Sequence, residues 1–271
     1  MTPDTDASHL VHAEYADLRA LADRTATHRL HSITPDDPEA AVRDALHLPD
    51  DRPLLDVGCG TGSFLHALLP RHTGRLVGLD TSPQAVEATR TDRIQAIEGS
   101  AEELPFSEGE FAIVTARHML YHVPNPQLAL EQAHRVLRPG GVFVATVNHR
   151  QVAQNTLDLV RTIVQEAGIT PAPAPVNSVT SDNLPAMVTA TFGTADTMRF
   201  DNTLALPTAE ALTTYAAALM SFAGLTPGHP ATAQIREEIS ERARRWFTNN
   251  PGRRWEDPKG YSLVTATRSS R

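Results

Sequence analysis

Short apolar runs alternate with amphipathic stretches between residues 53 and 148. The apolar runs are PLLDVG, RLVGLD, DRIQAIEG, EFAIVTA and GGVFVATVN, and stretches with helical spacing separate them. Strands that alternate with helices of this length form βαβ units, and such units build a parallel sheet covered by helices on both faces. The pattern therefore predicts an α/β, doubly wound fold with five parallel strands in this region.

The flanking segments carry weaker signals. Apolar residues recur at helical spacing from Ser8 to Leu30, and an Asp-Pro pair opens a second helix from Pro38 to Leu46. Beyond residue 148 we expect helices at 151–167, 208–222 and 231–247, strands at 195–200 and 261–268, and a Pro-rich loop at 168–185.

These elements together predict a seven-stranded, mostly parallel sheet whose last strand is antiparallel. We expect three parts along the chain. Residues 1–48 hold N-terminal helices that form a lid, residues 49–150 form a ligand-binding core, and residues 151–271 form a helical cap and the last two strands.

Composition and charge narrow the class of function. The chain is 41% hydrophobic and 21% charged, with a formal net charge of −8, and this acidic balance argues against broad binding to nucleic-acid phosphates. Its N-terminus has no secretory signal and the chain has no membrane-length apolar run. A single cysteine, Cys59, excludes an intramolecular disulfide and a Cys-based zinc site. We expect a cytoplasmic protein that acts on a small molecule, without nucleic acid or membrane; a homodimer stays open.

The most informative residues lie in the stretch LLDVGCGTGSFL, residues 54–65. Gly58, Gly60 and Gly62 alternate at a predicted strand-to-helix turn, and Asp80 ends the next apolar run. Alternating glycines allow the backbone to approach a ligand and leave a helix N-terminus facing it. An acid at the end of the second strand is placed to accept hydrogen bonds from ribose hydroxyls. The motif therefore predicts a ligand that contains adenosine.

Two residues decide between NAD and S-adenosylmethionine. The dinucleotide fingerprint requires Gly or Ala at position 63, and this chain has Ser63. Asp56 precedes the glycines, where its carboxylate would bind the amino group of a methionine moiety directly or through water but would repel a diphosphate. The residues favour S-adenosylmethionine.

Four ordered blocks of sequence carry a resemblance to a known family. They are the glycine turn, Asp80, the stretch EGSAEELPFSEGEFAIVTARHMLYHV and the stretch ALEQAHRVLRPGGVFVATV. Together they resemble the class I S-adenosylmethionine-dependent methyltransferases, in the branch that includes the ubiquinone and menaquinone methyltransferases. The resemblance covers residues 50 to 148. It implies contacts to the cofactor's methionine part from Asp56, Gly58 and Gly60 and to the ribose from Asp80, with Cys59, Gly62 and Arg117 completing this side of the site.

The adenine end departs from the family pattern. The family usually has an acid followed by a small residue after the third strand, whereas this chain has Ser100, Ala101 and Glu102. The Ser100 hydroxyl and the Ala101 backbone N–H are expected to hold the adenine, or Glu102 swings in to do so. Thr81 and Ser82 line the ribose–adenine edge or cap the next helix.

The residues that follow the fourth and fifth predicted strands are candidates for substrate binding and catalysis. His118 is the first candidate general base and His149 the second, because both follow strands at the edge where open α/β sheets bind ligands. His122 and Tyr121 are expected beside the substrate, and Tyr15 on the N-terminal helix is expected to close over it. The spacing of His118 and His122 suits a shared metal, but no third ligand has a signature spacing, so no metal is expected.

The acceptor is expected to be a small, partly apolar organic molecule methylated on oxygen, nitrogen or carbon. Lys259 is the single lysine among 24 basic residues, a bias associated with GC-rich bacterial genomes and hence with secondary metabolism. Two other classes stay open: a cyclase or decarboxylase that uses the fold without methylating, and a regulatory subunit that pairs with an active partner.

Overall fold

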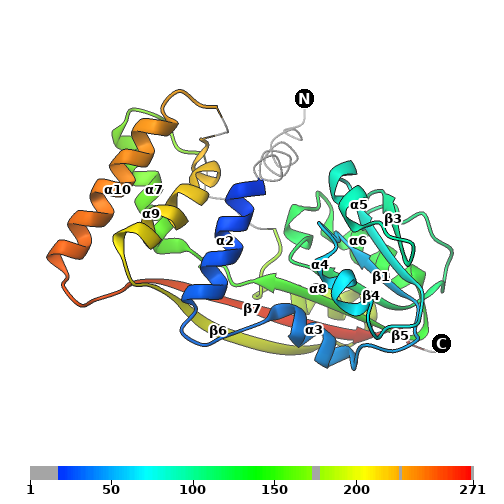
Figure 1. The fold of residues 1–271 in the computed structure, drawn as a ribbon. Helices are drawn as coiled ribbons and strands as arrows, with labels where there is room; N and C mark the ends of the chain where they lie inside the picture. The colour runs from blue at the N-terminus through cyan, green and yellow to red at the C-terminus, as the bar shows by residue number, and fades with distance from the viewer. Residues whose placement is uncertain (1–17, 173–177, 226–227, 270–271) are drawn as a thin grey trace. The chain divides into compact units, whose positions relative to one another are not determined.

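The computed structural model describes residues 18–172, 178–225 and 228–269 of the chain (Figure 1). Two compact units share the chain between them. The sheet unit comprises Asp37–Arg150, Asn177–Phe200 and Tyr261–Arg271, and the helical unit comprises Met1–Asp36, Gln151–Val176 and Asp201–Gly260. Each unit is therefore assembled from three stretches of sequence.

A seven-stranded sheet forms within the described residues, in the order β3-β2-β1-β4-β5-β7-β6. The first five strands pair in parallel, and β7 pairs antiparallel with β5, with Asn148 opposite Tyr261. This confirms the predicted fold class, including the antiparallel last strand. The strands are β1 (Leu54–Val57), β2 (Leu76–Asp80), β3 (Ile94–Glu98), β4 (Phe111–Arg117), β5 (Leu137–Asn148), β6 (Asp196–Leu206) and β7 (Trp255–Thr267).

Three helices of the sheet unit begin at an N-cap residue that is followed by a proline. Asp37, Ser82 and Asn125 each accept a hydrogen bond from a backbone N–H of the first turn, and proline follows each of them. The helices of this unit are α3 (Pro38–Leu46), α4 (Ser63–Leu68), α5 (Pro83–Thr89), the 3-10 turn η1 (Leu120–His122), α6 (Pro126–Val136) and α8 (Leu184–Phe192).

The two faces of the sheet bury separate apolar clusters. Successive strand residues alternate between them, so Leu54 packs in the cluster that includes α3 and α4, whereas Leu55 packs in the cluster that includes α6 and α8. Helices therefore cover both faces of the parallel part, as the βαβ pattern predicts. The strand order reverses direction between β1 and β4, and ligands of doubly wound folds bind at that crossover, beyond the carboxyl ends of the strands.

The helical unit contains its own apolar core. Val160 and Ile163 pack with Ile235 and Ile239 in one cluster, and Tyr215 lies in another. Its helices are α2 (Leu18–His31), α7 (Gln154–Glu166), α9 (Ala209–Ala218), the 3-10 turn η2 (Met220–Ala223) and α10 (Thr232–Asn249). Within the described residues, no helix is both long enough and apolar enough to span a bilayer.

Four expectations for the last third of the chain differ from the structure. Strand β6 extends to Leu206, six residues beyond its predicted end. Helix α8 was not predicted, because its sequence LPAMVTATF is apolar on nearly every side and shows no polar face. The predicted helix 208–222 divides into α9 and η2. Strand β7 begins at Trp255 rather than at residue 261, because Asp257 in its polar first half is buried and accepts the backbone N–H groups of Asn155 and Thr156. These hydrogen bonds cap the first turn of α7.

The N-terminal prediction is confirmed in part. Helix α3 has the predicted bounds, and its apolar residues pack in the sheet unit. Helix α2 ends at His31, one residue beyond the predicted end, while the predicted beginning of this helix and Tyr15 lie outside the described residues. A lid formed by residues 1–48 stays a prediction.

Candidate functional site

The glycine turn joins β1 to α4. Gly58, Gly60 and Gly62 have φ values of 68°, 55° and 77°, in the left-handed region that side chains with a Cβ rarely adopt. The backbone N–H groups of Gly58 and Cys59 both donate to the carbonyl oxygen of Leu79, at 2.7 and 3.1 Å. The turn is therefore anchored to the end of β2 and needs glycine for its shape.

Gly60 is the open point of this turn. A Cβ atom built on Gly58 would lie 2.7 Å from Met119, and one on Gly62 would lie 2.7 Å from Thr89, but one on Gly60 would meet no protein atom within 4 Å. A ligand therefore has room to approach the backbone at Gly60.

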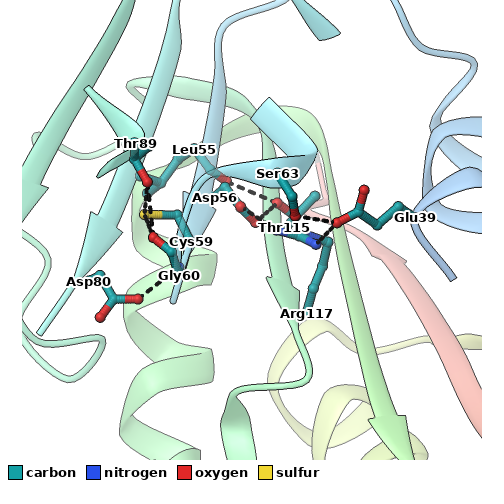
Figure 2. Close-up of polar contacts among 10 residues, drawn as sticks. All are labelled: Glu39, Leu55, Asp56, Cys59, Gly60, Ser63, Asp80, Thr89, Thr115 and Arg117. Carbon is teal, nitrogen blue, oxygen red and sulfur yellow. Dashed lines mark hydrogen bonds and ion pairs between the residues drawn. The ribbon is translucent and has the colours of Figure 1, made fainter. Parts of the chain in front are cut away.

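Asp80 closes the same turn from the end of β2. One carboxylate oxygen accepts the Gly60 N–H (Figure 2), and the other accepts the Ser82 N–H, both at 2.9 Å. Each carboxylate oxygen has two lone pairs, so each has a lone pair left for a ribose hydroxyl. The open space at Gly60 beside an anchored carboxylate fits the predicted adenosine ligand.

Asp56 and Arg117 form a buried ion pair beneath the turn. Arg117 Nη2 lies 2.7 Å from Asp56 Oδ2 and its Nε lies 3.1 Å from Oδ1, which also accepts the Thr115 hydroxyl at 2.6 Å. Burial alone would lower the pKa of Arg117, but the adjacent Asp56 carboxylate raises it. Asp56 is fully buried. Its carboxylate thus holds Arg117 and Thr115, and its contact with a methionine amino group, direct or through water, stays a prediction.

Glu39 extends this network from outside the glycine motif. Its Oε1 accepts the Ser63 hydroxyl at 2.6 Å and lies 3.3 Å from Arg117 Nη1 (Figure 2). The guanidinium of Arg117 also lies 4.4 Å from the centre of the Phe64 ring. The sequence analysis missed Glu39, whose only signal is that of an acid in the first turn of a helix. Helix α3 therefore contributes a charge to the site.

Cys59 and Thr89 support the turn from below. The Thr89 hydroxyl donates to the Gly60 carbonyl oxygen at 2.9 Å, and the Cys59 thiol lies 3.6 Å from the same hydroxyl. Burial and the nearby Asp56 carboxylate raise the pKa of Cys59 to about 12. The thiol is therefore protonated and packs against Thr89, a supporting residue that the motif did not reveal, and contact of Cys59 with the cofactor stays a prediction.

The residues predicted for the adenine end follow β3. The Gly99 N–H donates to the carbonyl oxygen of Asp80 at 3.0 Å, which ties this segment to the end of β2. Ser100 Oγ accepts the Glu102 N–H at 3.1 Å, while Glu102 Oε1 accepts the Asn125 N–H at 3.0 Å. Glu102 thus holds the start of α6 in this structure. The structure contains Ala101 in a buried position, and adenine binding by this segment stays a prediction.

Thr81 and Ser82, the residues predicted at the ribose–adenine edge, follow β2 directly. Ser82 caps α5 and accepts the Ala85 N–H at 3.3 Å. Thr81 is exposed next to it. Ser82 therefore caps α5, and contact of Thr81 and Ser82 with the ribose–adenine edge stays a prediction.

The predicted substrate-side residues lie beyond β4. His118 adopts a left-handed backbone, with φ of 51°, and donates its N–H to the Thr146 carbonyl oxygen. Its ring contacts Tyr261 edge to face, with centroids 6.0 Å apart. Tyr121 and His122 belong to η1 and form a ring pair of their own, with centroids 4.5 Å apart.

His149 follows β5 and contacts Ser181, a residue that the sequence analysis did not single out. Its Nδ1 lies 2.6 Å from the hydroxyl of Ser181, in a segment predicted only as loop. The two histidines therefore follow neighbouring parallel strands at the same edge of the sheet. Within the described part of the chain, no cluster of three His, Cys, Asp or Glu side chains is arranged to hold a metal ion.

Comparison with known families and proteins agrees with this geometry. The methyltransferase domain family matches residues 55–145. The ubiquinone biosynthesis O-methyltransferase of Pseudomonas paraeruginosa is 32% identical over 167 residues, which are 54% of this chain and 67% of that protein. The demethylmenaquinone methyltransferase of Staphylococcus epidermidis is 33% identical over 129 residues, 45% of this chain and 52% of that protein.

Other relatives match over smaller parts or at lower identity. An uncharacterized 37.1 kDa protein in transposon Tn4556 of Streptomyces fradiae is 36% identical over 39% of this chain, and the match spans only a third of that protein (33%). Among solved structures, the YcgJ protein of Bacillus subtilis has a TM-score of 0.56 at 18% identity and covers 85% of this chain and 97% of its own. The [4+2]-cyclase SpnF has a TM-score of 0.55 at 18% identity, with coverages of 89% and 87%. The structural matches share the fold.

Proposed function

Because this chain belongs to the S-adenosylmethionine-dependent methyltransferase family, we propose that it transfers a methyl group from S-adenosylmethionine to a small organic acceptor. The observation that carries the proposal is the open backbone at Gly60 beside the anchored carboxylate of Asp80. When bound, this cofactor supplies a methyl group activated by a positively charged sulfur.

On the cofactor side, the residues of the glycine turn bind and orient S-adenosylmethionine. The free lone pairs of Asp80 accept the ribose hydroxyls, and the Gly58–Gly60 backbone faces the methionine part. The Asp56–Arg117 pair holds β1 and β4 together beneath the turn, so these two residues position the turn. Methyl transfer is an in-line displacement, so holding the reactants in one orientation supplies most of the catalysis.

The acceptor side is proposed from chemistry and from the names of relatives. The Pseudomonas relative is named as an O-methyltransferase of ubiquinone biosynthesis, which favours an acceptor oxygen on an aromatic ring. An acceptor hydroxyl must lose its proton during transfer, and a histidine near neutral pKa suits this task. His118 and His149 are the two proposed bases, and Tyr121 and His122 are proposed to lie beside the acceptor. A role in bacterial secondary metabolism, a cytoplasmic location and a homodimer stay predictions.

A cyclisation without methyl transfer is the second candidate function. The cyclase SpnF has the same fold with a TM-score of 0.55, so the fold itself does not select methyl transfer. Formation of S-adenosylhomocysteine separates the two functions, because a cyclase leaves the cofactor's methyl group in place. The same measurement excludes a purely regulatory subunit.

Two experiments test the proposal. Titration calorimetry is expected to show binding of S-adenosylmethionine and S-adenosylhomocysteine and no comparable heat with NAD. The protein is then incubated with S-adenosylmethionine and one acceptor at a time: catechol for oxygen, phenethylamine for nitrogen and 1,4-naphthohydroquinone for carbon. More S-adenosylhomocysteine in a reaction with acceptor than in the control reaction without acceptor supports methyl transfer. Cofactor binding without any release would favour the cyclase or the regulatory function, and absence of binding would refute the cofactor site.

A further inference from the structure

The segment 178–183 docks against the end of β5. The Ser181 N–H donates to the carbonyl oxygen of Asn148 at 3.2 Å, and the Ser181 hydroxyl lies 3.3 Å from the carbonyl oxygen of Val147. Ser181 is 7% exposed, and the preceding Thr180 is buried as well. The backbone of Ser181 is thus fixed to the strand that ends beside His149.

Side chains within the segment hold its shape. Asn183 Oδ1 accepts the Thr180 N–H at 2.8 Å, and Thr180 Oγ1 accepts the Asp182 N–H at 3.3 Å. Beside it, Arg150 Nε lies 3.3 Å from Asp182 Oδ2. The hydrogen bond of the Ser181 backbone to β5 and the hydrogen bonds among Thr180, Asp182 and Asn183 therefore hold Ser181 beside His149.

The tautomer of His149 depends on where the single proton of the Ser181 hydroxyl goes. It has two acceptors within reach, the Val147 carbonyl oxygen at 3.3 Å and an unprotonated His149 Nδ1 at 2.6 Å. When the hydroxyl donates to Val147, its oxygen accepts the ring proton on Nδ1. Because a neutral imidazole has one N–H, that arrangement puts a lone pair on Nε2.

We propose that Ser181 is a positioning residue that fixes neutral His149 with its proton on Nδ1, and that His149 Nε2 is the base that takes the acceptor's proton. The geometric basis is the chain of contacts from Val147 through Ser181 to His149, at the sheet edge where β4 and β5 end. The role of His149 as the base rests on the proposed function, whereas the tautomer of His149 does not.

The step balances in atoms and charge. The acceptor hydroxyl oxygen forms a bond to the methyl carbon, and the electron pair of the broken carbon–sulfur bond stays on sulfur. The hydroxyl proton goes to His149 Nε2. The positive charge lost at sulfur appears on the imidazolium, whose Nδ1–H still donates to Ser181. Solvent removes the proton afterwards, so no oxidant or reductant is needed.

The tautomer is tested on the free protein by ¹⁵N NMR of histidine-labelled protein, with His149→Gln assigning the signals. The neutral ring is expected to show a protonated Nδ1 and an unprotonated Nε2. Ser181→Ala is expected to shift the population toward the Nε2–H form, and Ser181→Thr to restore the original signals. Ser178→Ala is the matched control, because Ser178 lies in the same segment but is exposed. A wild-type ring protonated on Nε2, or signals that Ser181→Ala leaves unchanged, would overturn the role of Ser181.

The role as base is tested by S-adenosylhomocysteine release with catechol as acceptor. His149→Gln is expected to lower kcat about 10²–10⁴-fold, the range for loss of a general base, with the affinity for S-adenosylmethionine retained. Ser181→Ala is expected to lower kcat about tenfold with little change in KM, and Ser178→Ala to leave both unchanged. Full activity of His149→Gln, or no turnover by the wild-type protein, would refute His149 as the base. In the second case the proposed function fails for catechol too, while the NMR result stands.

Discussion

Arg117, the last residue of β4, binds both carboxylate oxygens of Asp56, the third residue of β1. Asp56 is fully buried and the Arg117 side chain is 10% exposed. Such a pair in a largely dry interior contributes little net stability over apolar residues, but loss of one partner leaves the other charge uncompensated. The crossover between β1 and β4 therefore depends on both residues together.

Replacement of Arg117 by Met is expected to lower the free energy of unfolding by about 3–5 kcal/mol, because the Asp56 carboxylate is then buried without its cation. Urea unfolding followed by circular dichroism measures the change. Arg245→Ala is the control, since Arg245 is 60% exposed and lies 3.7 Å from Glu241 in an exposed pair, a kind worth at most about 1 kcal/mol. Equal losses for the two variants would contradict the importance of the buried pair.

Comparison of Gly60→Ala with Gly140→Ala separates the effect of backbone strain on stability from the effect of ligand contact on binding. The left-handed backbone costs an L-residue about 1–2 kcal/mol of stability. The added methyl group also enters the space proposed for the ligand, and such overpacking costs about 1–3 kcal/mol in binding. Gly140→Ala is matched to it, because Gly140 also has a positive φ, of 76°, and no atom within 4 Å of its Cβ position. Calorimetry is expected to show weaker S-adenosylmethionine binding for Gly60→Ala alone, although both variants lose similar stability.

Asp80→Ala is expected to weaken S-adenosylmethionine binding about 10- to 150-fold, which corresponds to the loss of charge-assisted hydrogen bonds worth about 1.5–3 kcal/mol. The variant also removes the acceptor of the Gly60 and Ser82 N–H groups, so its stability is measured in parallel. Asp92→Ala removes an exposed carboxylate elsewhere in the sheet unit and should bind normally. Unchanged affinity in Asp80→Ala would remove this carboxylate from the proposed site.

The stability of the protein is expected to fall below pH 6.5 in part because of His28. Burial, and then the positive charge of Lys259, lower the pKa of His28 to about 4, and its Nε2 lies 3.2 Å from the Tyr215 hydroxyl. Between pH 6.5 and 4 the unfolded chain binds a proton at this histidine that the folded chain does not, so acidification favours unfolding. Urea unfolding at several pH values is expected to show a flatter dependence for His28→Gln. An unchanged slope would show that the folded and unfolded states titrate alike at this residue.

Local patterns made the parallel strands and the glycine turn predictable, because each is encoded by residues adjacent in sequence. Asp56 and Arg117 belong to the recognised blocks, but their pairing joins residues 61 positions apart. Glu39 reaches Arg117 across 78 positions and Ser181 reaches His149 across 32. No local spacing encodes such contacts, because they exist only after the helices and loops have packed. Helix α8 escaped prediction for another reason: a segment apolar on nearly every side has no periodicity to detect.

The sheet order also bears on how the protein is made. Strand β6 lies at the edge of the described sheet beside β7, and Leu204 of β6 also forms an isolated antiparallel bridge with Ser32. Strand β6 ends at residue 206 and β7 begins at residue 255, so the ribosome completes β6 about fifty residues before it begins β7. During that interval an unpaired strand edge is exposed to other chains. The exposed first residues of β6 include the charged side chains of Asp196 and Arg199, and charges on a strand edge discourage pairing with another chain before β7 is synthesised.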